Sequence, residues 1–214
     1  MIKNEMFTKA SGIVLIVLVA LTGAIYVNAQ EGAAGPGTTL ENLMTTYNTE
    51  SNSHIRYLTF AEQAAVEGYD AAASLFRAVA FAEQVRCEFY AGMIRELGGE
   101  PKADIETPVV GSTMENLEAA LKTESNEAKV VYPAFLEEAK KDGNKEAIDA
   151  FMGAEAAGNI YAELYSQMLK NLEFSKGLVK DFFVCPVCGN VVDSITWSRC
   201  PICSTDAKKF KRIK

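Results

Sequence analysis

Two long stretches of the chain place apolar residues three and four positions apart, the spacing that buries one face of an α-helix. They cover residues 39–98 and 113–175, and both are rich in alanine, glutamate, leucine and lysine. Breaker residues divide each stretch, at Glu67-Gly68 in the first and at Asp142-Gly143-Asn144 in the second. The pattern therefore predicts four helices, over about 40–66, 70–97, 113–141 and 145–174.

The connection from Gly98 to Ser112 contains two prolines and is long for a link between neighbouring helices. It suits a crossover between two helical hairpins, and the four helices then form a four-helix bundle. The hairpins also resemble each other, since Thr49-Glu50-Ser51-Asn52 in the first recurs as Thr123-Glu124-Ser125-Asn126 in the second, an offset of 74 in the numbering. From the hairpin turn onward the offset is 75, and the repeat predicts that Glu50 faces Glu124 across a pseudo-twofold axis.

The first 29 residues have the features of an export segment. Lys3 and Lys9 precede an uncharged apolar run over 12–27, and Val27-Asn28-Ala29 is a plausible cleavage site. The run is slightly shorter than a usual membrane span, so residues 1–29 are either a signal peptide or an uncleaved N-terminal membrane anchor. Both interpretations predict an exported protein, periplasmic or otherwise extracytoplasmic, with membrane contact only through this segment. Residues 30–39 are rich in glycine, alanine and proline and predict a flexible lead-in.

Charge is divided unevenly along the rest of the chain. Residues 30–175 contain 11 basic and 24 acidic residues, a balance of −13, whereas residues 176–214 contain 8 and 3, a balance of +5. The two readings are a solvated acidic surface beside a basic tail, and electrostatic docking of that tail on an acidic body. The basic residues are too few and too clustered at one end to indicate nucleic-acid binding.

Residues 179–214 form a tail that favours β-structure and is too short to bury a core unaided. It holds Cys185-Pro-Val-Cys188 and Cys200-Pro-Ile-Cys203, and the fifth cysteine, Cys87, lies far away in a helical stretch. Two C-P-x-C turns that face each other bring four thiolates onto one metal ion. Two disulfides are the alternative in an exported protein, and the twin tight spacing favours the metal. Four thiolates suit iron, a one-electron carrier, and zinc, a structural ion, equally well.

The whole arrangement resembles the rubrerythrin family, in which a ferritin-like four-helix body precedes a rubredoxin-like four-cysteine domain. The resemblance covers about Leu40 to the C-terminus, and motifs in both parts of the chain carry it: Thr49-Glu50-Ser51 with Tyr57, Glu67-Gly68-Tyr69, Asn116-Leu117 with Glu124 and Glu127, Tyr132-Pro133 and both cysteine turns. It implies a mainly α protein, with a ferritin-like domain over 40–175 and a rubredoxin-like metal-binding β domain over 179–214. It also implies a homodimer, a redox partner protein, and reduction of hydrogen peroxide at a di-iron site.

The di-iron ligands of the family carry over only in part. The carboxylates match Glu50, Glu83, Glu124 and Glu127, whereas the three remaining ligand positions hold Arg86, Gly158 and Tyr161. His54 is the only histidine of the chain, and no E-x-x-H pair is present. The di-iron site is therefore doubtful.

Two accounts of this altered site stay open. In the first, Arg86, protons and Tyr161 compensate the four buried carboxylates, and the body holds no metal. In the second, His54 turns inward and joins the glutamates in an altered metal site. The first account predicts an electron-transfer or interaction module with a catalytically silent body, and the second predicts a peroxide-reducing oxidoreductase.

Overall fold

A computed structural model describes residues 37–214 of the chain. The predicted signal peptide or anchor, and most of the lead-in, lie outside the described residues. Within residues 37–214, no helix combines the length and the apolar character that a membrane crossing requires.

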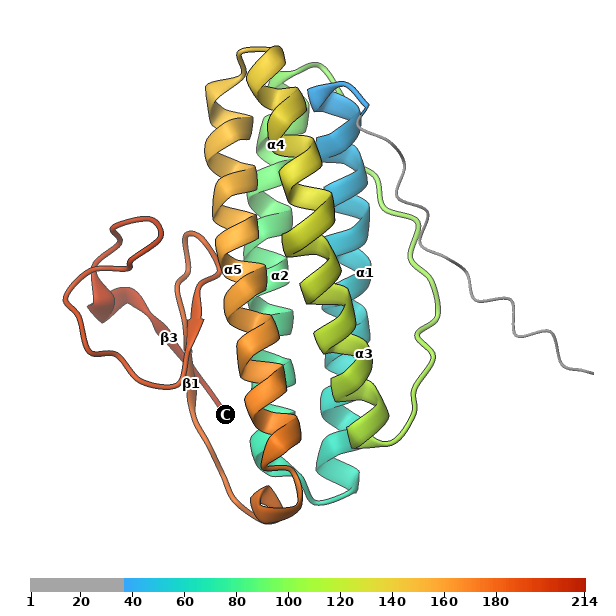
Figure 1. Ribbon diagram of the computed structural model, residues 1–214, viewed down its shortest axis with the longest axis vertical. Coiled ribbons are helices and arrows are strands. Elements are labelled where there is room, and N and C mark those ends of the chain that lie inside the picture. The colour runs from blue at the N-terminus through green and yellow to red at the C-terminus, as the bar shows by residue number, and fades with distance from the viewer. Residues whose placement is uncertain (1–36) are drawn as a thin grey trace, which may run out of the picture. The chain divides into compact units, whose positions relative to one another are not determined.

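Four long helical segments form the bundle that the apolar pattern predicts (Figure 1). The first hairpin is α1 (Thr39–Val66) and α2 (Asp70–Glu96), and the second is α3 (Thr113–Asn126), a π-helical segment (Glu127–Val131) and α4 (Tyr132–Lys141), followed by α5 (Lys145–Lys170). The mainly helical, ferritin-like fold with a small C-terminal sheet is thus confirmed.

Two helix limits differ from the prediction. The segment predicted as one helix over 113–141 contains the π-helical turns at Glu127–Val131, which widen the helix locally beside two buried glutamates. The last helix ends at Lys170, four residues before the predicted Phe174. Asn171 leaves helical geometry there at φ −114°, and the chain tightens into a 3-10 turn, Glu173–Ser175.

The internal repeat is visible in how the two hairpins begin. Thr38 and Ser112, which the repeat places in equivalent positions, each form a capping box with the glutamate three residues later. Each cap is then tied to the turn of the other hairpin. Thr39 donates from its backbone N–H and hydroxyl to Asp142, and Thr113 donates in the same way to Glu67. The repeat predicted from sequence is therefore a real pseudo-twofold relation between the hairpins.

The connection between the hairpins runs along the length of the bundle, as predicted for a crossover (Figure 1). Two asparagines of α1 hold its middle part in place. Asn48 accepts from the backbone N–H of Asp104 at 2.8 Å, and Asn52 bonds both Asp104 and Glu106.

Buried apolar side chains form two clusters rather than one core. The first includes Tyr57, Phe76 and Tyr165, and the second includes Tyr90 and Phe151. The buried glutamates, which are described below, form a separate polar cluster inside the bundle.

The tail forms a three-stranded antiparallel sheet in the order β2-β1-β3 (β1 Phe182–Val184, β2 Val191–Val192, β3 Lys211–Ile213). Phe182, Val184 and Val191 belong to the first apolar cluster of the body, so the sheet packs on the bundle, chiefly against α2. Two ion pairs of the tail, Lys180–Asp193 and Arg212–Asp181, lie within the tail itself. Apolar burial therefore contributes to the docking of the tail on the body, together with the contacts of Arg77 with Lys214 and of Lys211 with the Phe81 ring.

Candidate functional site

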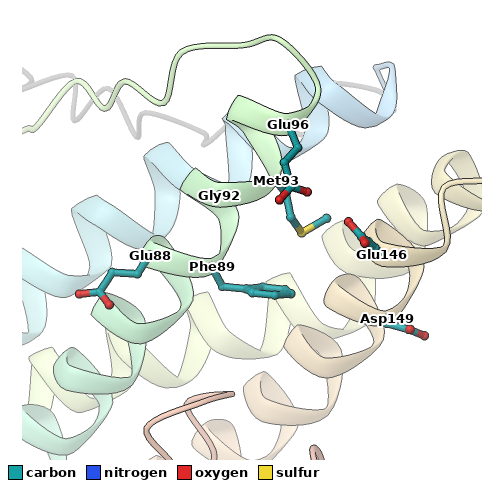
Figure 2. Close-up of a pocket in the computed structure, with 7 residues that line it drawn as sticks. All are labelled: Glu88, Phe89, Gly92, Met93, Glu96, Glu146 and Asp149. Atoms are coloured by element: carbon teal, nitrogen blue, oxygen red, sulfur yellow. The ribbon is translucent and has the colours of Figure 1, made fainter.

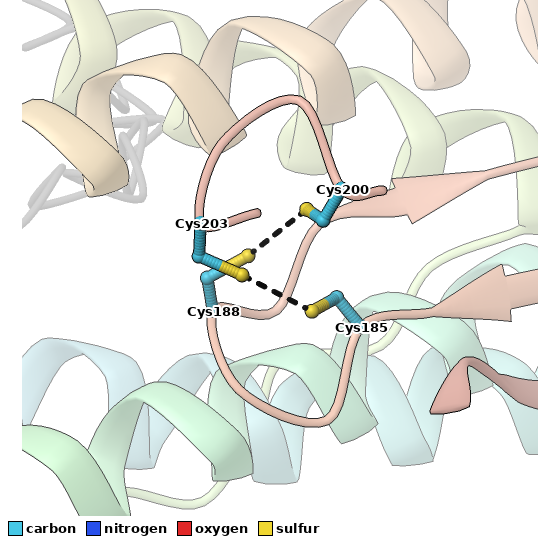
Figure 3. A group of neighbouring side chains, drawn as sticks. All are labelled: Cys185, Cys188, Cys200 and Cys203. Carbon is cyan, nitrogen blue, oxygen red and sulfur yellow. Dashed lines mark hydrogen bonds between the residues drawn. The ribbon is translucent and has the colours of Figure 1, made fainter. Parts of the chain in front are cut away.

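The two C-P-x-C turns bring the four cysteines together as the sequence predicts (Figure 3). All four Sγ atoms lie within 4.8 Å of one another, and within residues 37–214 no other group of three or more metal-ligating side chains comes as close. Sγ of Cys185 lies 3.5 Å from that of Cys203, and Sγ of Cys188 lies 3.6 Å from that of Cys200. A tetrahedral ion with metal–sulfur bonds of about 2.3 Å separates its thiolates by a similar distance. The donor set therefore fits a single metal ion, which the four thiolates would hold.

Polar groups of the tail surround the cysteine sulfurs. The backbone N–H of Asn190 lies near Cys188, and the Asn190 side chain donates to Cys200 at 3.7 Å. A hydrogen bond from the Cys188 thiol lowers the pKa of Cys185 to about 5, with further help from backbone N–H groups. The pKa of Cys188 on the same turn is raised, first by its hydrogen bond to Cys185 and then by burial, and burial raises the pKa of Cys200.

One side of this site is open to a cavity of about 600 Å³ between the tail, α2 and α5. Cys188, Cys203 and Val187 border it from the tail, and Arg86 and Phe89 border it from α2. A second pocket of about 420 Å³ shares Phe89 and lies farther along the same two helices (Figure 2). Its rim carries four carboxylates, Glu88, Glu96, Glu146 and Asp149. The cysteine site is therefore open on the side of this cavity.

The four predicted glutamates converge in the bundle and are all buried. Glu50 lies on α1, Glu83 on α2, Glu124 on α3 and Glu127 on the π-helical segment.

Two tyrosines on α1 and α4 reach across the bundle to these glutamates. Tyr57 donates to Glu124 and Tyr132 donates to Glu50, each at 2.6 Å. The role of these tyrosines as donors to the glutamates was not predicted from the sequence.

Arg86 lies inside the carboxylate cluster and is only 4% exposed. Its Nε and Nη2 donate to Glu50, with the shortest contact at 2.7 Å, and Nη2 also makes a very close contact with Glu83. Nη1 donates to the hydroxyl of Tyr161 at 2.9 Å. One guanidinium thus connects two carboxylates and a phenol, the geometry for which a planar fork of donors is suited.

Burial raises the pKa of Glu83 and Glu127 well above the usual range and that of Glu124 to about 7. Burial acts on Glu50 in the same sense, but the charge of Arg86 and the hydrogen bonds from its neighbours outweigh it, so the pKa of Glu50 is lowered. At neutral pH the cluster is therefore a neutral Glu50–Arg86 pair beside protonated Glu83 and Glu127, while Glu124 titrates near neutral pH. A protonated Glu83 still accepts from Arg86 through its carbonyl oxygen.

The other residues at ligand positions also depart from a di-iron arrangement. A side chain at Gly158 would begin 3.2 Å from the Cβ of Ala128, so it fits only if Ala128 shifts by a few tenths of an ångström. His54 Nδ1 lies 2.7 Å from the backbone carbonyl of Ala80, and this contact engages the ring outside the carboxylate cluster. Four carboxylates with a guanidinium among them and no imidazole do not match the carboxylate and histidine set of a di-iron protein.

The helical body with its buried glutamates, joined to a four-cysteine domain, defines the class of this chain: a ferritin-like four-helix protein with an appended four-thiolate site. The comparisons with known proteins narrow that class. The family model Rubrerythrin matches residues 41–169, and the chain belongs to the rubrerythrin family.

Curated relatives cover most of the chain. Nigerythrin of Nitratidesulfovibrio vulgaris is 32% identical over 168 residues, which are 78% of this chain and 82% of the relative. Rubrerythrin-2 of Clostridium acetobutylicum is 31% identical over 176 residues, 81% and 95% of the two chains. The fully reduced, all-ferrous structure of nigerythrin superposes with a TM-score of 0.78 at 29% identity, covering 86% of this chain and 91% of that one.

Proposed function

We propose that this protein is a one-electron carrier with iron at Cys185, Cys188, Cys200 and Cys203, and that its helical body holds no di-iron pair. The observation that carries the proposal is the position of Arg86, bonded to two of the four glutamates where a di-iron site would need its metal. A guanidinium at this position supplies the positive charge that a metal would otherwise supply.

Iron bound by four thiolates supplies an Fe(III)/Fe(II) couple that gains and loses one electron with little change of geometry. The residues of this chain hold that ion and control access to it. Cys188 and Cys203 are half-buried and border the open cavity, whereas Cys185 and Cys200 are buried. An external redox protein would supply the electron at the open side, and the cavity is the route by which a partner comes nearest to the thiolates.

Metal counting on the purified protein tests the proposal. We expect about one iron per chain, the visible absorption of iron thiolate, and no second metal. Two or three metals per chain would refute the silent body, and a colourless protein with one zinc would refute electron transfer. A triple variant, Arg86→His with Gly158→Glu and Tyr161→His, restores the missing ligands, and we expect it to bind more metal than the parent.

Peroxide reduction at an altered carboxylate site is the second candidate function. It is supported by three buried carboxylate oxygens without a hydrogen-bond partner: Glu83 Oε1, Glu124 Oε2 and Glu127 Oε1. Such oxygens suit a hard cation. The same metal count decides between the two candidates, because this activity requires metal in the body.

We also propose that residues 1–29 export the protein and that it works as a homodimer with a separate redox partner. The export proposal rests on the apolar run behind Lys3 and Lys9. The mass of the mature chain tests cleavage after Ala29, cell fractionation tests the compartment, and light scattering in solution tests the dimer.

A further inference from the structure

A continuous chain of hydrogen bonds connects the carboxylate cluster of the body to the first cysteine turn of the tail. Arg86 donates to the hydroxyl oxygen of Tyr161 at 2.9 Å, and that hydroxyl donates its own proton to the backbone carbonyl of Gly189 at 2.5 Å. Tyr161 is fully buried and Arg86 nearly so, so water does not compete for these bonds.

The peptide group at Gly189 continues the chain to a metal ligand. Its carbonyl oxygen accepts from Tyr161, and the N–H of the same peptide group, which belongs to Asn190, lies next to Cys188, where it favours the thiolate over the thiol. A hydrogen bond accepted by a peptide oxygen polarises the group and strengthens its N–H as a donor. The hydroxyl of Tyr161 therefore reaches Cys188 through one peptide bond.

The close approach of tail and body at this point depends on glycine. Gly189 has φ +76°, and a Cβ atom there would lie 3.0 Å from the carbonyl oxygen of Ala82 and 3.2 Å from the Tyr161 hydroxyl. The Arg86 guanidinium also lies 5.0 Å from the centre of the Tyr161 ring, which holds the phenol in place from the body side. Gly189 on the tail side and Arg86 on the body side therefore both fix the position of the Tyr161 hydroxyl.

We propose that Tyr161, supported by Arg86, is a positioning residue that raises the reduction potential of the metal at the four cysteines. This inference rests on the proposed function, that is, on iron at that site. The reduced site carries one more negative charge than the oxidised site, and hydrogen bonds to the sulfurs stabilise that charge. Tyr161 and Arg86 stand at positions that hold iron ligands in the rubrerythrin family, and in this chain they would instead influence the metal at the four cysteines.

The test compares Tyr161→Phe with Tyr165→Phe in the full, iron-loaded protein. Tyr165 is a matched control because it lies one turn away on α5, is equally buried, and has a hydroxyl without a hydrogen-bond partner. We expect Tyr161→Phe to lower the ratio of reduced to oxidised protein at a fixed potential by about two- to fivefold. At about 59 mV per tenfold for one electron, that is a decrease of about 20–40 mV. Tyr165→Phe should leave the potential unchanged. No decrease in Tyr161→Phe, or an equal decrease in both variants, would overturn the inference.

A second measurement separates polarisation from loosening of the tail and does not require iron. In ¹⁵N-labelled, zinc-loaded protein we expect Tyr161→Phe to shift the Asn190 amide proton upfield while the other amides of the cysteine turns stay in place. Shifts spread over the whole tail would show that Tyr161 only docks the domain, and would overturn the relay. If the native protein proves to contain zinc, the proposed function fails, yet the Asn190 amide still reports on the hydrogen-bond chain.

Discussion

Replacing Glu124 by glutamine should change how the stability of the protein depends on pH. Burial raises the pKa of Glu124 from 4.5 to about 7 in the folded protein. Between these values the folded protein holds a proton that the unfolded chain has released. The contribution of this group to stability is therefore complete below about pH 4.5 and is lost as the pH rises through 7.

The size of the effect follows from the shift in pKa. One pKa unit corresponds to about 1.36 kcal/mol, so a shift from 4.5 to about 7 is worth about 3 kcal/mol. Glutamine does not titrate, and its side-chain carbonyl retains an acceptor for the Tyr57 hydroxyl, which donates to Glu124 at 2.6 Å. We therefore expect the stability of Glu124→Gln relative to the parent to improve by up to about 3 kcal/mol between pH 5 and pH 8.

Urea unfolding of the metal-loaded protein, followed by circular dichroism at pH 5, 6, 7 and 8, measures this difference. Glu118→Gln is the control, because Glu118 lies on the same helix and is exposed. It should change the free energy of unfolding by less than about 0.5 kcal/mol at every pH. A difference between Glu124→Gln and the parent that does not vary with pH would refute the reasoning and would show that Glu124 is ionised in the fold, as a metal ligand would be.

Three further predictions concern the charge at the centre of the bundle and the tail domain. Arg86→Met should lower the free energy of unfolding by about 3–5 kcal/mol at pH 7, because Glu50 loses its partner. Adding Glu50→Gln should recover much of that loss in urea unfolding, and strictly additive losses would contradict the pairing. Removal of the metal with a chelator should unfold residues 179–214 and leave the helical circular dichroism near its original value, since four thiolates staple a tail without a core of its own. A collapse of the helical signal would show that the body depends on the tail. Gly189→Ala should destabilise the docked tail by about 1–3 kcal/mol, because φ is +76° there, and faster release of metal to a chelator measures it; unchanged release would contradict the close contact.

The sequence was sufficient for the helices and for the cysteine site, because both depend on local spacing. Apolar periodicity and the breakers Glu67-Gly68 and Asp142-Gly143 placed the helix ends to within a few residues, and the capping residues Thr38 and Ser112 confirm the starts. Each C-P-x-C turn brings its own two sulfur atoms together, so two such turns indicate a four-thiolate cluster however the tail packs on the body.

The family resemblance also indicated which ligand positions were lost, namely those of Arg86, Gly158 and Tyr161. The sequence did not indicate the π-helical segment at Glu127–Val131, because a helical turn with hydrogen bonds between residues five positions apart has no distinctive amino-acid composition. The sequence also left open whether His54 turns inward, since helical spacing alone does not determine the partner of a side chain near the edge of a face, and the structure places its ring on the Ala80 carbonyl outside the cluster.

What only the tertiary structure decided is how charges and hydrogen bonds are shared between segments far apart in the chain. The pairing of Arg86 with Glu50 rather than with solvent, and the contact of Tyr161 with Gly189, join residues 36 and 28 positions apart. Such contacts depend on how helices and tail pack against each other, and so does the low dielectric that sets the protonation of the glutamates. The sequence by itself determined which chemical groups this protein possesses, and packing decided which of them meet.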